Sequence, residues 1–245
     1  MTAKDILSRF KQFSFFDTFK HSSTYFTGTL LTQALGIISL PVFTALLTSE
    51  EYGIVNVFTS YVLVFSVLLS LYLHGATSRY YFEKDKDDFD SFLGAIVITV
   101  TLFFAVFGAI VFSFRELIAK IINLPVQVVI WLLITSYLVV FYTLFTQIMI
   151  ATKESKKFAT VQVVWHYLKF ICAVLGFLYL AGVTFSYSGQ ESSYTFMGKI
   201  IGEVIATVLI ILYTTYQIFK FMSFKGMSIK HIKYAMVYAL PLIPF

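Results

Sequence analysis

The stretch FATVQVVWHYLKFICAVLGFLYLAG, residues 158–182, decides the fold class. It runs for roughly 25 residues, which is long enough to cross a bilayer as a helix. It contains no acidic residue and a single lysine, Lys169, near its middle. A charged side chain in the driest layer of a membrane is costly and usually marks a functional position. The stretch therefore raises two questions: how the rest of the chain spans a membrane, and what Lys169 does there.

The overall composition agrees with a membrane environment. The chain is 58% hydrophobic and 13% charged, with a mean hydropathy of +0.83. Soluble domains are about 45–50% apolar and about 25% charged. A soluble core could not bury this much apolar surface, so the sequence predicts a polytopic membrane protein of the all-α class. Cys172 is the single cysteine of the chain and lies within an apolar run, so no intrachain disulfide is expected.

Hydrophobic runs predict a bundle of six complete transmembrane helices and the start of a seventh. Each run is continuous and about twice as long as a membrane strand, which excludes a barrel of alternating strands. The six predicted spans are residues 22–47, 53–77, 91–114, 126–150, 158–182 and 196–219. The seventh begins near Tyr234 and is cut short at Phe245, because about ten residues cannot cross a bilayer.

The same pattern predicts four segments. They are a cytoplasmic amphipathic N-terminal segment (1–21), a six-helix transmembrane lobe (22–222), a cytoplasmic linker (223–233) and the truncated start of a seventh helix (234–245). Ile6, Phe10 and Phe13 recur at helical spacing with bases between them, which indicates a short helix on the inner leaflet. A disordered tail is the alternative for this segment.

The basic residues predict the orientation of the bundle. Fourteen of the 18 Lys and Arg fall in the N-terminal segment and in the second, fourth and sixth connections, whereas the third connection holds two. Because cytoplasmic loops carry the excess of Lys and Arg, we expect a cytoplasmic N-terminus. The positive net charge then reflects topology and attraction to anionic lipid, and no nucleic acid partner is expected.

Ionisable side chains inside the spans are the candidate site residues. Lys169 lies too deep to reach either surface easily, so we expect it to face a wet cavity or a structural partner on a neighbouring helix. His166 lies one turn away on the same face, where two cations would support each other around an anion. Both side chains are therefore candidate ligands of an anionic substrate.

Lys199 and Glu203 are four residues apart in the sixth span and can pair along one helix face. One interpretation is a neutral pair that eases insertion into the membrane. The other is that Glu203 accepts a proton or coordinates a cation while Lys199 is its switchable partner, which would suit an ion-coupled carrier.

Arg79, in the segment HGATSRYYFEKD, lies at the cytoplasmic end of the second span. It is either an anchor that reaches into the headgroup layer or a phosphate ligand, since the planar guanidinium matches phosphate oxygens. The sequence has no phosphate-binding loop of the G-x-x-x-x-G-K-[ST] type, no metal-spaced Cys/His cluster and no G-x-S-x-G motif. No cofactor is expected, apart from coupling to a proton or sodium gradient.

Three segments carry a resemblance to a known family. YFTGTLLTQALGIISLPVFTALLTSEEYGIVNVFTSY (25–61) contains a first span with scattered Gly and Thr, Pro41 near its outer end and a Leu-x-x-x-Glu-Tyr-Gly turn at 47–53. LHGATSRYYFE (73–83) and YALPLIPF (238–245) follow in the expected order. Together they resemble the bacterial polysaccharide flippase family, which includes O-antigen transporters, within the superfamily of multidrug, oligosaccharidyl-lipid and polysaccharide exporters.

The resemblance implies a fold and a function. Members are similar in having two helical lobes around a cationic central cavity, and they move polyprenyl-diphosphate-linked glycans from the inner to the outer leaflet of the bacterial cytoplasmic membrane by alternating access coupled to an ion gradient. Carried to this chain, it implies that Arg79 and Lys169 lie toward the cavity. It also implies that the chain is one lobe, the N-terminal one, and that a missing C-terminal lobe is its partner. No family motif fixes Lys169 or Glu203.

The sequence therefore predicts a flippase lobe, not an enzyme, embedded in the lipid bilayer. Its predicted substrate ligands are Lys169, Arg79, His166 and Lys199, and its predicted ion-coupling residue is Glu203. A drug or cation exporter of the same superfamily is one alternative, which would favour acidic over basic cavity residues. A membrane-embedded polyprenyl-sugar glycosyltransferase or polymerase is another, with Glu50 and Glu51 as its acids. A scaffold without transport is the last.

Overall fold

The computed structural model describes residues 3–83, 88–188, 195–239 and 241, and the side chains of residues 19–83, 88–182, 195–239 and 241. Over these residues the chain forms nine helices and no strand, which confirms the predicted all-α bundle. The helices are α1 (Ala3–Leu46), α2 (Ser49–Ser70), α3 (Leu73–Glu83), α4 (Phe89–Ser113), α5 (Arg115–Ile122), α6 (Val126–Ala151), α7 (Ser155–Ser188), α8 (Thr195–Lys220) and α9 (Ile229–Ala239).

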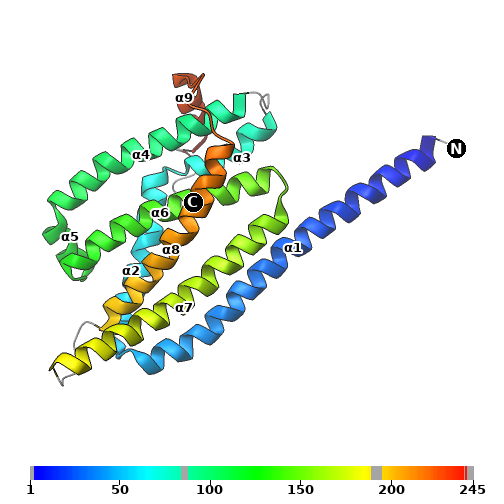
Figure 1. The fold of residues 1–245 in the computed structure, drawn as a ribbon. Coiled ribbons are helices and arrows are strands. Elements are labelled where there is room, and N and C mark those ends of the chain that lie inside the picture. The colour runs from blue at the N-terminus through cyan, green and yellow to red at the C-terminus, as the bar shows by residue number, and fades with distance from the viewer. Residues whose placement is uncertain (1–2, 84–87, 189–194, 240, 242–245) are drawn as a thin grey trace.

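Each of the six predicted spans is confirmed as helical, although a break divides the second. Six helices in the described parts of the chain are long and apolar enough to cross a membrane. These spans are Phe19–Leu46 in α1, Ser49–Ser70, Phe89–Ser113, Val126–Ala151, Ser155–Gly182 in α7, and Thr195–Lys220. Successive spans run in opposite directions, so their connections alternate between the two ends of the bundle (Figure 1).

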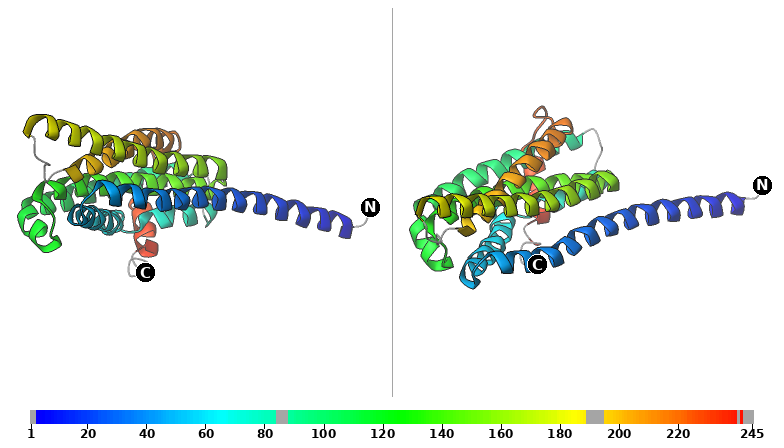
Figure 2. Two further views of the ribbon diagram at one scale, coloured as in Figure 1. Left: turned by 90° about the horizontal axis from the view of Figure 1, so that it is seen from below. Right: turned by 60° about the horizontal axis from the view of Figure 1, so that its bottom comes forward.

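The helices lie side by side in an order that differs from their order in the sequence. α1 packs along α7, α7 along α8, and α8 along α6, which in turn contacts α2, α3 and α4 (Figures 1 and 2). The short helix α9 packs against α3 and α4 at one end of the bundle. The N-terminal part of α1 extends beyond the helices that its C-terminal part contacts. This order places α7 and α8 together between α1 and α6.

Glycine makes the seam between α7 and α8 unusually close. A Cβ atom built on Gly202 of α8 would collide with the backbone carbonyl of Cys172 in α7. A Cβ on Gly176 of α7 would likewise collide with the carbonyl of Gly198 in α8. Small residues let helix backbones approach each other within a membrane, where such packing replaces the hydrophobic effect as the source of association. The seam therefore holds polar side chains of α7 and α8 at short range.

The second predicted span, 53–77, differs from the structure because a break interrupts it. α2 ends at Ser70 and α3 begins at Leu73. Between them Leu71 and Tyr72 adopt the left-handed conformation, with φ of 45° and 56°. That conformation costs roughly 1–2 kcal/mol for a residue with a side chain. The Ser70 hydroxyl accepts a hydrogen bond from the Tyr72 amide at 3.3 Å, which compensates part of the lost helical bonding.

The two ends of the chain also differ in detail from the predicted segments. The backbone is one continuous helix from Ala3 to Leu46, so residues 3–21 extend the first span, and their position on the inner leaflet stays a prediction. α9 begins at Ile229, within the segment predicted as a linker. Residues 240 and 242–245 of the predicted seventh span lie outside the described residues.

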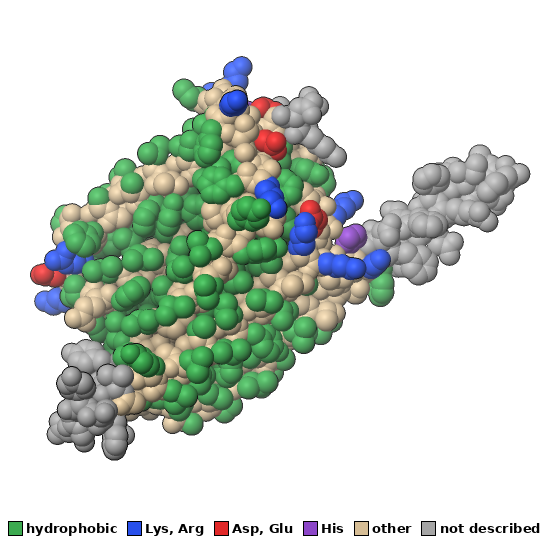
Figure 3. Space-filling view, in the orientation of Figure 1, with side chains coloured by type: hydrophobic (Ala, Val, Ile, Leu, Met, Phe, Trp, Pro, Cys, Tyr) green, Lys and Arg blue, Asp and Glu red, His purple; other side chains and the backbone are tan. Residues whose placement is uncertain are grey.

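The surface of the bundle is apolar between two charged ends. Figure 3 shows a face covered by hydrophobic side chains, with Lys, Arg, Asp and Glu gathered at its margins. On α4, Leu102, Val106 and Ile110 are each more than half exposed and recur every fourth residue. An exposed apolar stripe of this kind is expected where a helix faces lipid, since contact with acyl chains carries no hydrophobic penalty.

Candidate functional site

One pocket brings together most of the predicted site residues. It has a volume of about 300 Å³ and lies between α1, α2, α7 and α8. Its polar lining consists of Thr32, Ser39, Tyr52, Asn56, Thr59, His166, Lys169, Lys199 and Glu203. Four of the five residues predicted from sequence are in this lining. The fifth, Arg79, is not.

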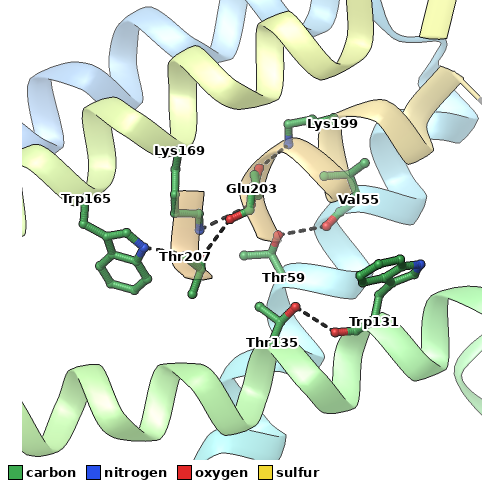
Figure 4. Close-up of polar contacts among 9 residues, drawn as sticks. All are labelled: Val55, Thr59, Trp131, Thr135, Trp165, Lys169, Lys199, Glu203 and Thr207. Carbon is green, nitrogen blue, oxygen red and sulfur yellow. Dashed lines mark hydrogen bonds and ion pairs between the residues drawn. The ribbon is translucent and has the colours of Figure 1, made fainter. Parts of the chain in front are cut away.

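An ion-pair triad forms the centre of the pocket lining. Lys169 Nζ lies 3.3 Å from Oε2 of Glu203, across the seam between α7 and α8. Lys199 Nζ lies 3.3 Å from Oε1 of the same carboxylate, one helical turn away on α8. Glu203 thus bridges the two ammonium groups, one with each oxygen (Figure 4). With all three groups ionised, the triad carries one excess positive charge.

Aromatic rings hold the two ammonium groups in place. Lys169 Nζ lies 5.4 Å from the ring centroid of Trp165, and Lys199 Nζ lies 4.5 Å from that of Phe43 in α1. Cations within about 6 Å of an aromatic face are attracted by its quadrupole, more strongly where water is scarce. Trp165 is itself anchored, because its Nε1 donates to the Thr207 hydroxyl at 3.4 Å (Figure 4). The rings therefore attract the two ammonium groups but leave their positive charge unbalanced.

The side chains of the triad are only partly covered. The exposed fractions are 27% for Lys169, 10% for Lys199 and 15% for Glu203. Lys199 and Glu203 are therefore nearly enclosed, whereas Lys169 presents part of its side chain to the pocket. A partly exposed ammonium beside a cavity can exchange its carboxylate partner for another anion without a change of fold.

His166 lines the same pocket but is already bonded on one side. Its Nδ1 lies 2.8 Å from the carbonyl oxygen of Gln162, one turn earlier in α7. A carbonyl only accepts, so Nδ1 carries the proton and donates. The other ring nitrogen, Nε2, is the one that can bond a ligand, as donor or acceptor according to protonation.

Arg79 lies on a separate groove at the end of α3. The groove has a volume of about 430 Å³ and is lined by Arg79, Lys230, Lys233, Tyr234, Val237 and Tyr238. Arg79 Nε donates to Glu83 at 2.6 Å, and the guanidinium lies 4.7 Å from the ring centroid of Tyr238. The structure therefore does not join Arg79 to the lysine pocket. It joins Arg79 to two lysines of α9 that the sequence interpretation assigned only to topology.

A second cluster at the same end escaped prediction from sequence. Nε2 of His231, a buried side chain of α9, donates to Asp88 at 2.7 Å, and the Tyr80 hydroxyl donates to the same carboxylate oxygen at 3.0 Å. The hydrogen bond from His231 lowers the pKa of Asp88. Burial, with the bond to Asp88, raises the pKa of Tyr80 to about 12. Residues so far apart in the chain leave no spacing signal, so only the fold reveals the cluster.

The described residues were compared with the side-chain sets that hold metal ions. They contain no group of three or more His, Cys, Asp and Glu side chains close enough to hold a metal ion. What the lysine pocket can do is bind an anion, by ion pairing and hydrogen bonding to ammonium groups that aromatic rings hold in position.

These features define a class: a multi-pass helical membrane protein with a basic pocket among its spans. The family follows from comparison. The family model described as "Polysaccharide biosynthesis protein" matches residues 19–243, so the chain belongs to that family, whose proteins are generally of the transporter or flippase type. No curated protein and no solved structure gives a significant match to the chain.

Proposed function

We propose that this protein moves a polyprenyl-diphosphate-linked oligosaccharide from the inner to the outer leaflet of the bacterial cytoplasmic membrane. The product would serve the synthesis of a surface polysaccharide such as O-antigen, capsule or exopolysaccharide. Membership of the polysaccharide biosynthesis family supports the pathway. The observation that carries the transport role is the pair of lysines, Lys169 and Lys199, beside a pocket among the spans.

The chemistry of the cargo explains the need for these lysines. A diphosphate leaving water for the interior of a membrane protein loses hydration worth many kcal/mol, so it crosses only where fixed charges replace the water. Lys169 and Lys199 supply two ammonium groups within one site. His166 Nε2 and the hydroxyls of the pocket add hydrogen bonds to phosphate or sugar oxygens.

Arg79 has a different place in the proposed pathway. Its groove, shared with Lys230 and Lys233, lies at the end of the bundle that holds most Lys and Arg, the proposed cytoplasmic end. A guanidinium there suits the capture of a phosphate before it enters the membrane. Glu203 is the proposed coupling residue, at which a proton or sodium ion resets the carrier. A second lobe, which the family resemblance implies, would close the pocket from the opposite side.

Two rival functions fit the pocket less well. A cation or drug exporter requires acidic groups, whereas this pocket contains two lysines and one glutamate. A glycosyltransferase was suggested by Glu50 and Glu51. Glu51, however, completes the cap of α2, accepting the Thr48 amide at 3.0 Å, and accepts the Thr195 hydroxyl at 2.6 Å. Its carboxylate therefore ties α2 to α8, which favours a structural role.

Replacing the most accessible lysine of the pocket tests the proposal. Lys169→Met keeps the length and apolar stem of the side chain but removes its charge. We expect surface polysaccharide to fall about tenfold or more, because a charge-assisted contact of about 1.5–3 kcal/mol is lost, while lipid-linked oligosaccharide accumulates on the inner leaflet. Lys120→Met, an exposed lysine of α5, is the control. Undiminished export at normal protein levels would overturn the role of Lys169.

A further inference from the structure

The triad has a geometry that bears on how the proposed carrier releases and accepts its cargo. The two oxygens of Glu203 are divided between Lys169 and Lys199, both at 3.3 Å. A phosphoryl group presents the same fork, two oxygens on one central atom, to a pair of cations. We infer that Glu203 is an internal substitute for the substrate's phosphate, and that the two anions compete for the same two ammonium groups. This inference rests on the proposed function.

Competition follows from charge and space. Lys199 and Glu203 are nearly enclosed, so a carboxylate and a diphosphate together would crowd like charges into a poorly hydrated site. Like charges at such range disfavour each other strongly where water is scarce. The triad offers one excess positive charge, which falls short of balancing a diphosphate. Substrate binding therefore requires that Glu203 withdraw from the lysines or lose its charge.

The competition fixes the sign of proton coupling. The ionisable side chains that face Glu203 in the pocket are Lys199 on its own helix, Lys169 and His166 on α7, and Tyr52 on α2, and the pocket residues of α1 are uncharged. A proton on Glu203 removes the competing charge and frees both ammonium groups. Proton uptake and anion binding then promote each other, by the reciprocity of linked equilibria.

A binding measurement on the purified full chain tests the inference. The probe is farnesyl diphosphate, a short prenyl diphosphate that has no glycan. It is titrated at pH 8 in detergent. We expect Glu203→Gln to bind the probe at least about tenfold more tightly than the unaltered protein, a difference of about 1.4 kcal/mol. Lys169→Met should bind it at least about tenfold more weakly, and Lys120→Met should match the unaltered protein.

The outcomes separate this inference from the proposed function. If Lys169→Met weakens binding but Glu203→Gln does not tighten it, the pocket binds the diphosphate and the competition is overturned. If Lys169→Met leaves binding unchanged, both the proposed lysine binding site and the competition with Glu203 are overturned. Tighter binding by Glu203→Gln together with weaker binding by Lys169→Met upholds both.

A second pair of variants guards against misfolding, since Glu203→Gln leaves two buried ammonium groups without their carboxylate. Lys199→Met alone is compared with Lys199→Met combined with Glu203→Gln, so that only one ammonium is left unpaired. The double variant should bind the probe more tightly than the single one. Equal or weaker binding in a folded double variant would overturn the competition.

The proton linkage has its own readout. The quantity to follow is the ratio of the affinity of the unaltered protein to that of Glu203→Gln. The titration of the diphosphate itself affects both affinities equally and cancels in this ratio. We expect this ratio to rise as the pH falls from 8 to 5, because a bound diphosphate raises the proton affinity of the neighbouring Glu203 carboxylate. A ratio that falls on acidification would mean that a proton displaces the anion, and would overturn the sign of the coupling.

Discussion

Glu203 is the most heavily committed side chain of the site, because one carboxylate serves two ammonium groups. Its loss should therefore destabilise the protein more than the loss of either lysine. Glu203→Gln leaves two neighbouring cations unbalanced, for which we expect a loss of about 3–5 kcal/mol. Lys199→Met leaves Glu203 paired with Lys169 and should lose less. Thermal unfolding in one detergent checks this order, and equal stability of the two variants would contradict it.

Single residues also show how much of the site could be predicted from the sequence. The spacing of Lys199 and Glu203 predicted their contact, which the structure contains, because two residues four apart share a helix face whatever the fold. The contact between Lys169 and Glu203 depends on the register of α7 against α8, which no local spacing encodes. The separation of Arg79 from the pocket likewise cannot be read from local spacing. It depends on the break at Leu71 and Tyr72, which separates α3, the helix of Arg79, from α2.

At the scale of elements, the α7–α8 seam determines whether the triad can form. Gly202→Ala places a methyl group against the backbone of Cys172, which cannot move aside as a flexible side chain could. We expect the helices to separate, with a loss of about 1–3 kcal/mol in stability. Polysaccharide export should fall to the level of Lys169→Met. Gly182→Ala on α7 meets open space and is the matched control. Normal export by Gly202→Ala would contradict this view of the seam.

The attachment of α9 to α3 and α4 should weaken at acidic pH. Because the folded protein holds the pKa of Asp88 below its ordinary value, the carboxylate stabilises the fold above the unfolded pKa of about 3.9 and loses this effect as the pH falls through the folded value. The Asp88 side chain is half exposed, so its contribution is at most about 1 kcal/mol. Asp88→Asn should lower the melting temperature at pH 7 and have a smaller effect at pH 3, below the unfolded pKa.

Asp90→Asn, an exposed carboxylate two residues away, is the control for that measurement. An equal effect of Asp88→Asn at both pH values would show that its ionisation does not hold α9 in place.

The elements were predictable to the extent that hydropathy defines them. All six spans were found, because each must be long and apolar to cross a bilayer. The break between α2 and α3 was not, since neither Leu71 nor Tyr72 is a glycine or proline and nothing local announces a positive φ. Tertiary packing imposes that conformation. Leu73 and Ala76, just beyond the break, are fully buried in the core that α3 shares with α6.

At the scale of the whole molecule, the position of charge should set both orientation and direction of transport. The connections rich in Lys and Arg lie at the end of the bundle that also carries Arg79, whereas α5 lies at the opposite end (Figure 1). If the positive-inside rule holds, the Arg79 groove faces the cytoplasm, where a newly made lipid-linked glycan would arrive. Orientation is thus a premise of the proposed pathway.

Labelling with a membrane-impermeant maleimide tests that premise. In a Cys172→Ala background, Glu116→Cys on α5 and Phe224→Cys after α8 place one exposed thiol at each end of the bundle. Neither change removes a basic residue, so the charge bias that sets topology is kept. We expect spheroplasts to label position 116 but not 224, and permeabilised membranes to label both. Labelling of 224 alone in spheroplasts would place Arg79 outside, where it could receive a released product but could not load a cytoplasmic substrate.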